Sequence, residues 1–236
     1  MHRKLNLYAA LFIAATVLYL SFMSIGLDYF DSFEYAFALE RWETALIHVH
    51  PPGYPIYVFV AKALQLLVQD TRLALTLFSA LSGSIGLILV ALIPATQKNK
   101  LAGLIAALIL VFLPGYWSSS EIALGDIPGT TFTLASMVCL LYVGKAHSAR
   151  YFILGCLLAG LSLGVRPQNA VPVMMASLVA IYNLRPVSTQ AIRTFILGLI
   201  AGVFGIIAWV LPIYQTFDGY NGYQGFDGYI ERLEAL

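Results

Sequence analysis

Long runs of apolar residues alternate with short polar stretches along almost the whole chain. Eight such runs stand out, at residues 5–25, 54–69, 72–94, 101–117, 127–144, 151–165, 169–184 and 193–213. Apolar runs of this length predict helices that cross a lipid bilayer, whose hydrocarbon core takes roughly 20 residues of helix. The pattern therefore predicts an all-α integral membrane protein.

The second run, Tyr54 to Gln69, decides the topology, because every later loop changes sides if this run crosses the bilayer. As a helix it is about 24 Å long, which is shorter than the roughly 30 Å hydrocarbon core. Lys62 lies at its centre, where a charge costs roughly 2.5–3.5 kcal/mol, and it shares a helical face with Gln65 and Gln69. These features favour a helix that lies along the membrane surface.

The distribution of basic residues supports the same topology, since cytoplasmic loops of membrane proteins are enriched in lysine and arginine. If the run stays outside, eight basic residues are cytoplasmic and five are external; if it crosses, five are inside and seven outside. The eight are Arg3, Lys4, Lys98, Lys100, Lys145, Arg150, Arg185 and Arg193. We therefore expect about seven transmembrane helices plus one or two external juxtamembrane amphipathic helices.

We expect residues 1–236 to form a single transmembrane domain in the inner (plasma) membrane. The apolar run after Met1-His2-Arg3-Lys4 is longer than the core of a cleavable signal, which predicts an uncleaved first span and a cytoplasmic N-terminus. The expected external parts are a first loop over residues 26–71, a second, acidic loop over 117–127 and a C-terminal segment over 214–236. The active face is then external, or periplasmic.

Composition excludes two kinds of function. The chain of 236 residues is 60% hydrophobic and 11% charged, against about 25% charged residues in a soluble domain, so the lipid bilayer is its main solvent. The 13 Lys+Arg and 12 Asp+Glu nearly cancel, so no basic field favours nucleic acid as a partner. Cys139 and Cys156 lie inside apolar runs and indicate neither a disulfide framework nor a thiolate metal site.

The first external loop carries two carboxylates at helical spacing. Asp31 and Glu34 share one helix face, whereas an apolar stripe on another face consists of Tyr35, Leu39, Trp42 and Leu46. A helix resting on the membrane through this stripe turns both carboxylates away from it. The alternative is that Asp31 is an N-cap with Glu34 three residues on, a capping-box-like start worth on the order of 1 kcal/mol.

A rigid turn is predicted at His48-Val-His50-Pro-Pro-Gly-Tyr54-Pro55, since proline fixes φ and glycine permits a sharp bend. Such a turn holds His50 in one place. His48 and His50 form a His-x-His pair, but without a clearly placed third ligand ordinary loop histidines are the preferred interpretation over a metal site.

The second acidic loop adds Glu121 and Asp126, which face the same side as Asp31 in the predicted topology. Each is a candidate for binding acceptor hydroxyls, for pairing with Arg166, or for completing a cation site with Asp31. The alternative for Asp126 is an N-cap before Pro128, and the alternative for Arg166 is an interfacial arginine that snorkels to the membrane surface. No Asp-x-Asp motif occurs, so the sequence indicates no metal and leaves cofactors undetermined.

The tail repeats Phe217-Asp-Gly-Tyr220 as Phe226-Asp-Gly-Tyr229. These aromatic rings are candidates for a lid over sugar or lipid headgroups, and an aromatic interfacial belt explains them equally well.

Taken in order, three of these motifs resemble those of a known family. An Asp31-x-x-Glu34-aromatic segment, then His50 to Pro55, then Trp117 and Glu121 in a second loop are similar to the bacterial proteins related to protein O-mannosyltransferases, in the C-type (GT-C) glycosyltransferase superfamily. The resemblance covers residues 1 to about 170 and implies a seven-span module, a polyprenyl-phosphate-linked sugar donor, and inverting transfer on the external face. The acceptor is expected to be a protein or an envelope glycan. Relatives usually continue beyond the seventh span, so the chain is expected to be short for the family.

Inverting transfer needs a base for the acceptor hydroxyl, and the resemblance assigns that role to Asp31. A lipid-phosphate leaving group needs its growing charge offset, and Arg166 is the best-placed fixed cation. The other expected substrate contacts are Glu34, His50, Tyr54, Glu121 and Asp126.

Two other functions compete with this interpretation. A non-catalytic membrane subunit or truncated remnant would bind a partner through its external loops. A transporter or channel predicts ionisable groups buried within spans, whereas the carboxylates here cluster in loops.

Overall fold

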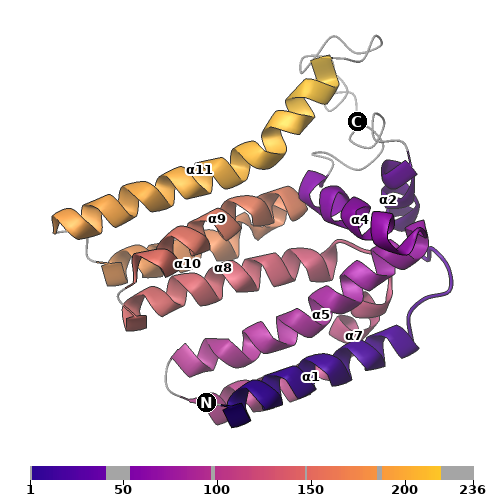
Figure 1. Cartoon of the computed structure of the whole chain (residues 1–236), viewed down its shortest axis with the longest axis horizontal. Coiled ribbons are helices and arrows are strands. Elements are labelled where there is room, and N and C mark those ends of the chain that lie inside the picture. The colour runs from indigo at the N-terminus through magenta and orange to yellow at the C-terminus, as the bar shows by residue number, and fades with distance from the viewer. Residues whose placement is uncertain (1, 41–53, 97–98, 147, 185–187, 219–236) are drawn as a thin grey trace.

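In a computed structural model, the chain forms a bundle of long helices with a group of shorter helices at one end (Figure 1). The structure describes residues 2–40, 54–96, 99–146, 148–184 and 188–218. Every regular element within these ranges is a helix. The predicted class, an all-α membrane protein, is confirmed.

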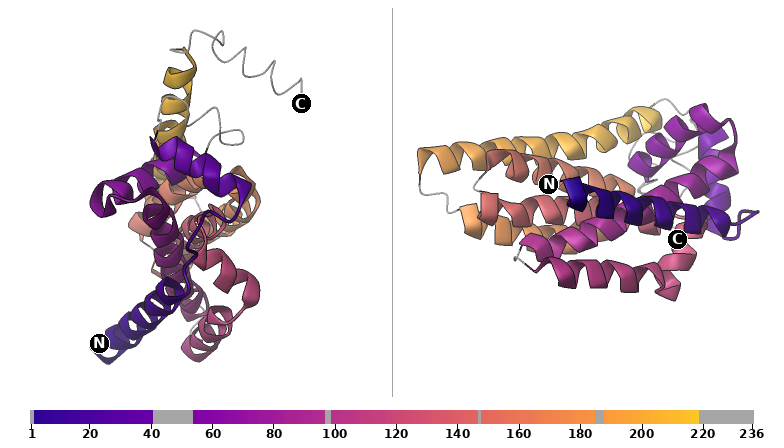
Figure 2. Two further views of the ribbon diagram at one scale, coloured as in Figure 1. Left: turned by 90° about the vertical axis from the view of Figure 1, so that its right-hand side faces the viewer. Right: turned by 60° about the horizontal axis from the view of Figure 1, so that its bottom comes forward.

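The helices of the bundle run back and forth between its two ends (Figures 1 and 2). Most agree with a predicted apolar run to within a few residues, because strong apolar runs without internal breakers leave little else to form. They are α1 (His2–Ser21), α5 (Thr71–Thr96), α6 (Lys100–Val111), α8 (Asp126–Ala146), α9 (Ala149–Val165), α10 (Ala170–Leu184) and α11 (Thr189–Asp218).

The shorter helices gather at the end where α1 ends and α5 begins (Figure 1). They are α2 (Phe30–Glu40), α4 (Pro55–Val68), α7 (Pro114–Glu121) and the 3-10 turn η1 (Pro167–Asn169). We call this end the capped end. Helix α4 begins and ends there, so it does not run the length of the bundle, which is the arrangement that the topology argument for Tyr54 to Gln69 needs.

Length and composition identify fewer spans than expected. Within the described residues three helical segments are long and apolar enough to cross a membrane, Thr71–Ile93, Asp126–Val143 and Thr189–Ile213. A fourth is present if α6 and α7, which meet at 64°, are one broken span. The remaining apolar helices are shorter, so the count of seven spans stays a prediction.

The expectation of one continuous helix over residues 101–117 is wrong. Helix α6 ends at Val111, and α7 begins with Pro114 at its first position. Proline has no N–H to donate and its ring disfavours a preceding turn of helix, so it starts a new helix more readily than it continues one.

Helices α9 and α11 pack backbone against backbone through glycines. A Cβ added to Gly160 would lie 2.3 Å from the carbonyl oxygen of Gly202, and one added to Gly205 would lie 2.6 Å from that of Leu157. The indole Nε1 of Trp209 donates a hydrogen bond of 3.0 Å to the Gly160 oxygen. Small residues permit the close approach on which helix association depends in lipid, where the hydrophobic effect does not drive it.

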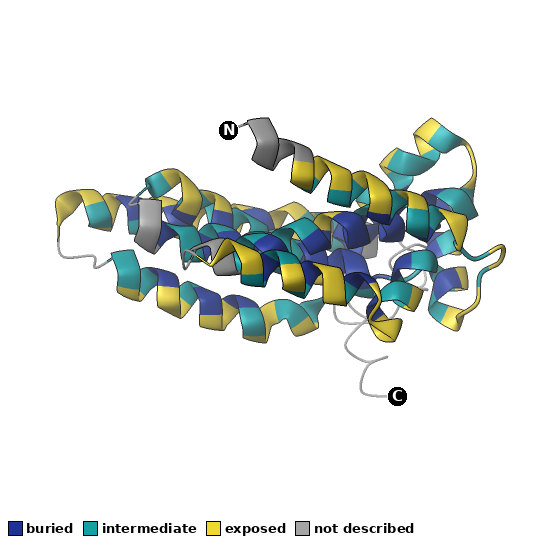
Figure 3. Ribbon diagram, turned by 90° about the horizontal axis from the view of Figure 1, so that it is seen from below, coloured by how far each residue is buried: buried dark blue, intermediate teal, exposed yellow. Residues whose placement is uncertain are grey.

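The outward faces of the bundle are apolar and exposed (Figure 3). In the apolar segment of α11 only 17% of the residues are buried inside the protein. Exposed side chains there include Ile200, Val203 and Phe204. Such a surface is stable against lipid tails, which are as apolar as the side chains themselves.

Lys62 is engaged inside the capped end. Its ammonium group donates to the carbonyl oxygen of Leu39 and, over 2.8 Å, to Oε1 of Gln65. Leu39 lies in the last turn of α2, whose carbonyls lack partners within the helix and form the negative end of its dipole. The charge that disfavours α4 as a span therefore stabilises the end of α2.

The substitution Gly160→Ala is expected to destabilise the protein by about 1–3 kcal/mol, because the new methyl group overpacks the α9–α11 contact. The measurement is the melting temperature of the purified protein in detergent. Gly115→Ala is the matched control, since a Cβ there meets nothing within 4 Å. Equal melting temperatures for the two variants would contradict the close packing.

Candidate functional site

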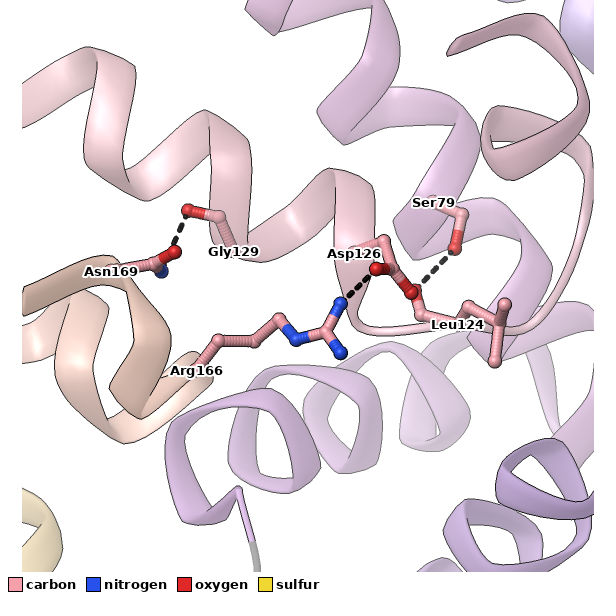
Figure 4. Close-up of polar contacts among 6 residues, drawn as sticks. All are labelled: Ser79, Leu124, Asp126, Gly129, Arg166 and Asn169. Atoms are coloured by element: carbon pink, nitrogen blue, oxygen red, sulfur yellow. Dashed lines mark hydrogen bonds and ion pairs between the residues drawn. The ribbon is translucent and has the colours of Figure 1, made fainter. Parts of the chain in front are cut away.

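An ion pair joins two elements at the capped end (Figure 4). Arg166 follows the last residue of α9 and donates through Nη1 to Oδ1 of Asp126, in the first turn of α8. The two side chains are 26% and 48% exposed, so the pair is open on one side. Of the roles left open for Asp126 and Arg166, the structure shows their pairing.

The turn that carries Arg166 is held by hydrogen bonds. The Arg166 amide donates to the Ser162 oxygen over 3.0 Å, and the Asn169 amide donates to the Arg166 oxygen over 3.1 Å. The side chain of Asn169 donates to the oxygens of Gly129 and Ser162, both at 3.1 Å. A Cβ on Gly129 would lie 3.0 Å from Cγ of Arg166, so the arginine stem lies flat on the first turns of α8. These contacts fix where the guanidinium group can reach.

The second acidic loop is tied down through its own carbonyl groups. Ser32 of α2 donates to the Ala123 oxygen over 2.8 Å, and Ser79 of α5 donates to the Leu124 oxygen over 3.1 Å (Figure 4). The Ser24 amide donates to the Glu121 oxygen over 2.9 Å. The two loops that the sequence predicts to be external are therefore in direct contact.

Three tyrosine rings form an aromatic cluster, which we call the aromatic floor, next to the residue that precedes Asp126. The ring of Tyr35 on α2 lies 6.0 Å from that of Tyr54 and 4.4 Å from that of Tyr57, and Tyr57 stacks on Phe78 at 5.3 Å. Tyr35 is 2% exposed and Tyr57 is fully buried. A Cβ on Gly125 would lie 3.2 Å from the Tyr35 hydroxyl, which places that hydroxyl beside the residue that precedes Asp126.

The buried Tyr35 hydroxyl is affected by charges from two separate segments, α2 and the turn after α9. Burial raises its pKa, the neighbouring tyrosines and Asp31 raise it further, and Arg166 opposes them. Asp31 lies one turn before Tyr35 on α2, and the Tyr35 hydroxyl lies beside Gly125, which precedes Asp126, the partner of Arg166. The structure thus brings together Asp31, Tyr54, Asp126 and Arg166 around this one side chain.

The other predicted residues of the first loop are placed less fully. Asp31 and Glu34 are half-buried on α2, and Asp31 lies in the first turn of the helix, which begins at Phe30 rather than after Asp31. Tyr35 and Leu39 are buried, as the predicted stripe requires. His48, His50, Trp42, Leu46 and the tail from residue 219 on lie outside the described residues.

Tyr54 makes the sharp bend that the Pro-Gly motif predicts. It precedes Pro55, the first residue of α4, and has a left-handed backbone with φ 47 and ψ 50. Such values are rare for a residue with a side chain, and here they are combined with almost complete burial of the tyrosine. The bend turns the chain directly into α4.

Glu121 has a different neighbour, Tyr19 of α1. It lies close enough to Tyr19 of α1 to act on it electrostatically, and its buried Oε1 has no hydrogen-bond partner among the described residues. Within those residues no three carboxylate, imidazole or thiol groups gather as a metal site requires. The suggested cation site of Asp31, Glu121 and Asp126 is therefore not formed, because Asp126 turns to Arg166.

Two residues of the site were not singled out from the sequence. Asn169 lies three residues after Arg166 across Pro167, a spacing typical of a short turn, and could have been weighed as its support. Tyr57 follows Tyr54 by one turn of helix, which looks like ordinary apolar packing until the position of its hydroxyl is known.

A comparison with protein families matches more than half of the chain. The model of the dolichyl-phosphate-mannose-protein mannosyltransferases matches residues 52–184, more than half of the chain. The chain belongs to this family. Within the protein mannosyltransferase match lie Tyr54, Glu121, Asp126 and Arg166, whereas Asp31, Glu34 and His50 precede it. Neither the curated proteins nor the solved structures gave a match.

The substitution Ser32→Ala is expected to loosen the contact between the two loops, because it leaves the buried Ala123 oxygen without its donor. The expected loss of stability is about 1–3 kcal/mol, with faster amide hydrogen exchange at residues 122–126. Ser21→Ala is the control, since Ser21 is exposed and bonds only within its own helix, to Val17. Unchanged amide hydrogen exchange at residues 122–126 in the Ser32 variant would argue that the Ser32–Ala123 hydrogen bond does not hold the second loop in place.

Proposed function

We propose that this member of the protein mannosyltransferase family transfers a sugar from a polyprenyl-phosphate carrier to a hydroxyl group of a protein or envelope glycan, with inversion, on the external face of the membrane. The observation that carries the proposal is the position of Tyr35, which lies one turn after Asp31 on α2 and whose hydroxyl lies beside Gly125, the residue before Asp126 of the Asp126–Arg166 pair. A carboxylate and an exposed cation from separate loops suit a transfer in which a proton leaves one reactant and negative charge grows on the other.

Asp31 acts as the base in this mechanism. Its carboxylate takes the proton of the acceptor hydroxyl as the oxygen attacks the anomeric carbon, and the bond from that carbon to the carrier phosphate breaks on the opposite face. The products are the glycosylated acceptor and the free polyprenyl phosphate. A positioned base of this kind contributes roughly 10²–10⁴-fold to a rate.

Arg166 receives the phosphate. Three basic residues are described at the capped end, and two of them are tied to backbone oxygens: Lys62 to Leu39, and Arg72 to Ser24 over 2.7 Å. Arg166 is instead bound to a carboxylate and is partly exposed, so an anionic ligand can compete for it. Its planar guanidinium group presents paired donors that match phosphate oxygens.

The remaining substrate contacts follow from position. Glu34 lies one turn after Asp31 on α2, and Tyr54 contributes to the aromatic floor. We assign these two, together with His50 and Glu121, to the sugar and the acceptor. Aromatic rings and carboxylates suit sugars, which present both apolar faces and hydroxyl groups.

The transporter alternative is disfavoured by where the charges lie. The acidic side chains that the structure describes are at the capped end, in α2 and the segment before it, in α7, directly before α5 and at the start of α8. Proton or ion pathways place such groups within the spans. A non-catalytic subunit remains distinguishable, because it would be insensitive to the loss of the base.

Asp31→Asn is expected to lower transfer from a labelled polyprenyl-phosphate sugar by at least about a hundredfold, because an amide cannot accept the proton. Membranes with matched amounts of each protein provide the assay. Asp28→Asn is the control, since Asp28 is an exposed carboxylate in the same loop, and its rate should stay within about twofold of the parent, as for a surface change. Full activity in the Asp31 variant would remove it as base.

The capped end is expected to face outward. Cysteine placed at Asp28 should react with a membrane-impermeant thiol reagent in intact cells, and cysteine placed at Arg150, exposed at the start of α9, should react only after the membrane is opened. The two engineered sites are each compared with the parent chain, whose Cys139 and Cys156 are partly buried. Reversed labelling would place the site in the cytoplasm.

A further inference from the structure

Tyr57 carries a buried hydroxyl group that has no evident role in the ligand-free structure. The residue is fully buried on α4, and its hydroxyl has no hydrogen-bond partner among the described residues. The ring cannot easily turn to find one, because it is packed between Tyr35 at 4.4 Å and Phe78 at 5.3 Å. Buried hydroxyl groups without partners are costly and uncommon, so this one needs a physical reason.

Asp126 directly follows the backbone against which the Tyr57 ring packs. The Tyr57 ring lies against Gly125, where a Cβ would be 3.8 Å from the ring, and Gly125 immediately precedes Asp126. Burial raises the pKa of Tyr57, and Asp126 raises it further. In the structure, however, that carboxylate is bound to Arg166.

Binding of a phosphate to Arg166 would remove the counter-charge of Asp126. The guanidinium group then serves the phosphate, and a half-buried carboxylate beside it loses its counter-charge. A carboxylate that has lost its counter-charge is destabilised by incomplete solvation, and it also repels the phosphate. A hydrogen bond from a neutral donor stabilises such a carboxylate strongly, since bonds to charged groups are the strong ones.

We propose that Tyr57 is a positioning residue that takes over Asp126 when Arg166 turns to the lipid phosphate. The exchange rests on the proposed function, because it requires a phosphate at Arg166. It gives the hydroxyl its partner in the ligand-bound state and keeps the carboxylate directed away from the ligand. No covalent bond changes in this step.

The test is the affinity of the full chain, in lipid nanodiscs, for a polyprenyl monophosphate without sugar. Tyr57→Phe removes only the hydroxyl, so the melting temperature without ligand should be unchanged or higher. Its affinity should fall about tenfold, as expected for a lost hydrogen bond to a charged group. Tyr19→Phe is the matched control, because Tyr19 is also a fully buried tyrosine but lies near Ser120 and Glu121 rather than beside Gly125 and Asp126. Its affinity should equal that of the parent.

A double-mutant cycle with Asp126→Asn tests whether Tyr57 acts through that residue. The inference predicts that Tyr57→Phe changes affinity by less than about twofold once the carboxylate is gone, since the two effects are coupled. Independent losses in the double variant, or equal losses in the Tyr57 and Tyr19 variants, would overturn it.

Arg166→Gln separates failure of this inference from failure of the proposed function. If the arginine variant binds weakly and Tyr57→Phe binds as the parent does, the exchange is wrong and the phosphate site stands. If the arginine variant binds as the parent does, the phosphate site is wrong and the exchange falls with it.

Discussion

The restriction of α4 to one end of the bundle is the constraint on which the rest of the structure depends. A helix of 14 residues with Lys62 near its middle is both too short and too polar to cross lipid comfortably. The lysine instead completes the last turn of α2. Because α4 returns the chain to the end where it started, α2, the second loop and the turn after α9 all meet there. Had α4 run the length of the bundle, Asp31 and Asp126 would lie at opposite ends.

The capped end combines a buried aromatic cluster with a partly exposed ion pair. Tyr35, Tyr57 and Phe78 exclude water beneath the site, and charges above an apolar floor interact more strongly than charges in water. The serine bonds from α2 and α5 to the second loop fix the distance between the two loops. Arrangement before substrate binds is what allows electrostatic stabilisation without reorganisation during the reaction.

Much of this fold follows from the apolar pattern, and the site follows from it only in part. The break between α6 and α7 was missed because the run is apolar throughout, and only Pro114 marks the start of a new helix. The close α9–α11 contact was not predicted, although Gly160-Leu-Ser-Leu-Gly164 and Gly198-Leu-Ile-Ala-Gly202 carry paired glycines at a spacing that brings helices together. Which acid pairs with Arg166 was not, since Glu121 and Asp126 are equivalent until tertiary packing orients them. The burial of the Tyr57 hydroxyl depends on packing from α2, α5 and the segment before α8, so no local sequence pattern predicts it.

The Asp126–Arg166 pair gives the proposed phosphate site a physical basis. An unpaired arginine in this half-buried position would lose hydration without compensation, and one held permanently by two carboxylates would not release. A single carboxylate, exposed on one side, neutralises the arginine while leaving part of its donor edge open to a ligand. Lys62 and Arg72, tied to backbone oxygens inside the same end, contribute positive potential without competing for the phosphate. In the proposed function, selectivity for phosphate over other anions would depend on the planar donor geometry of Arg166.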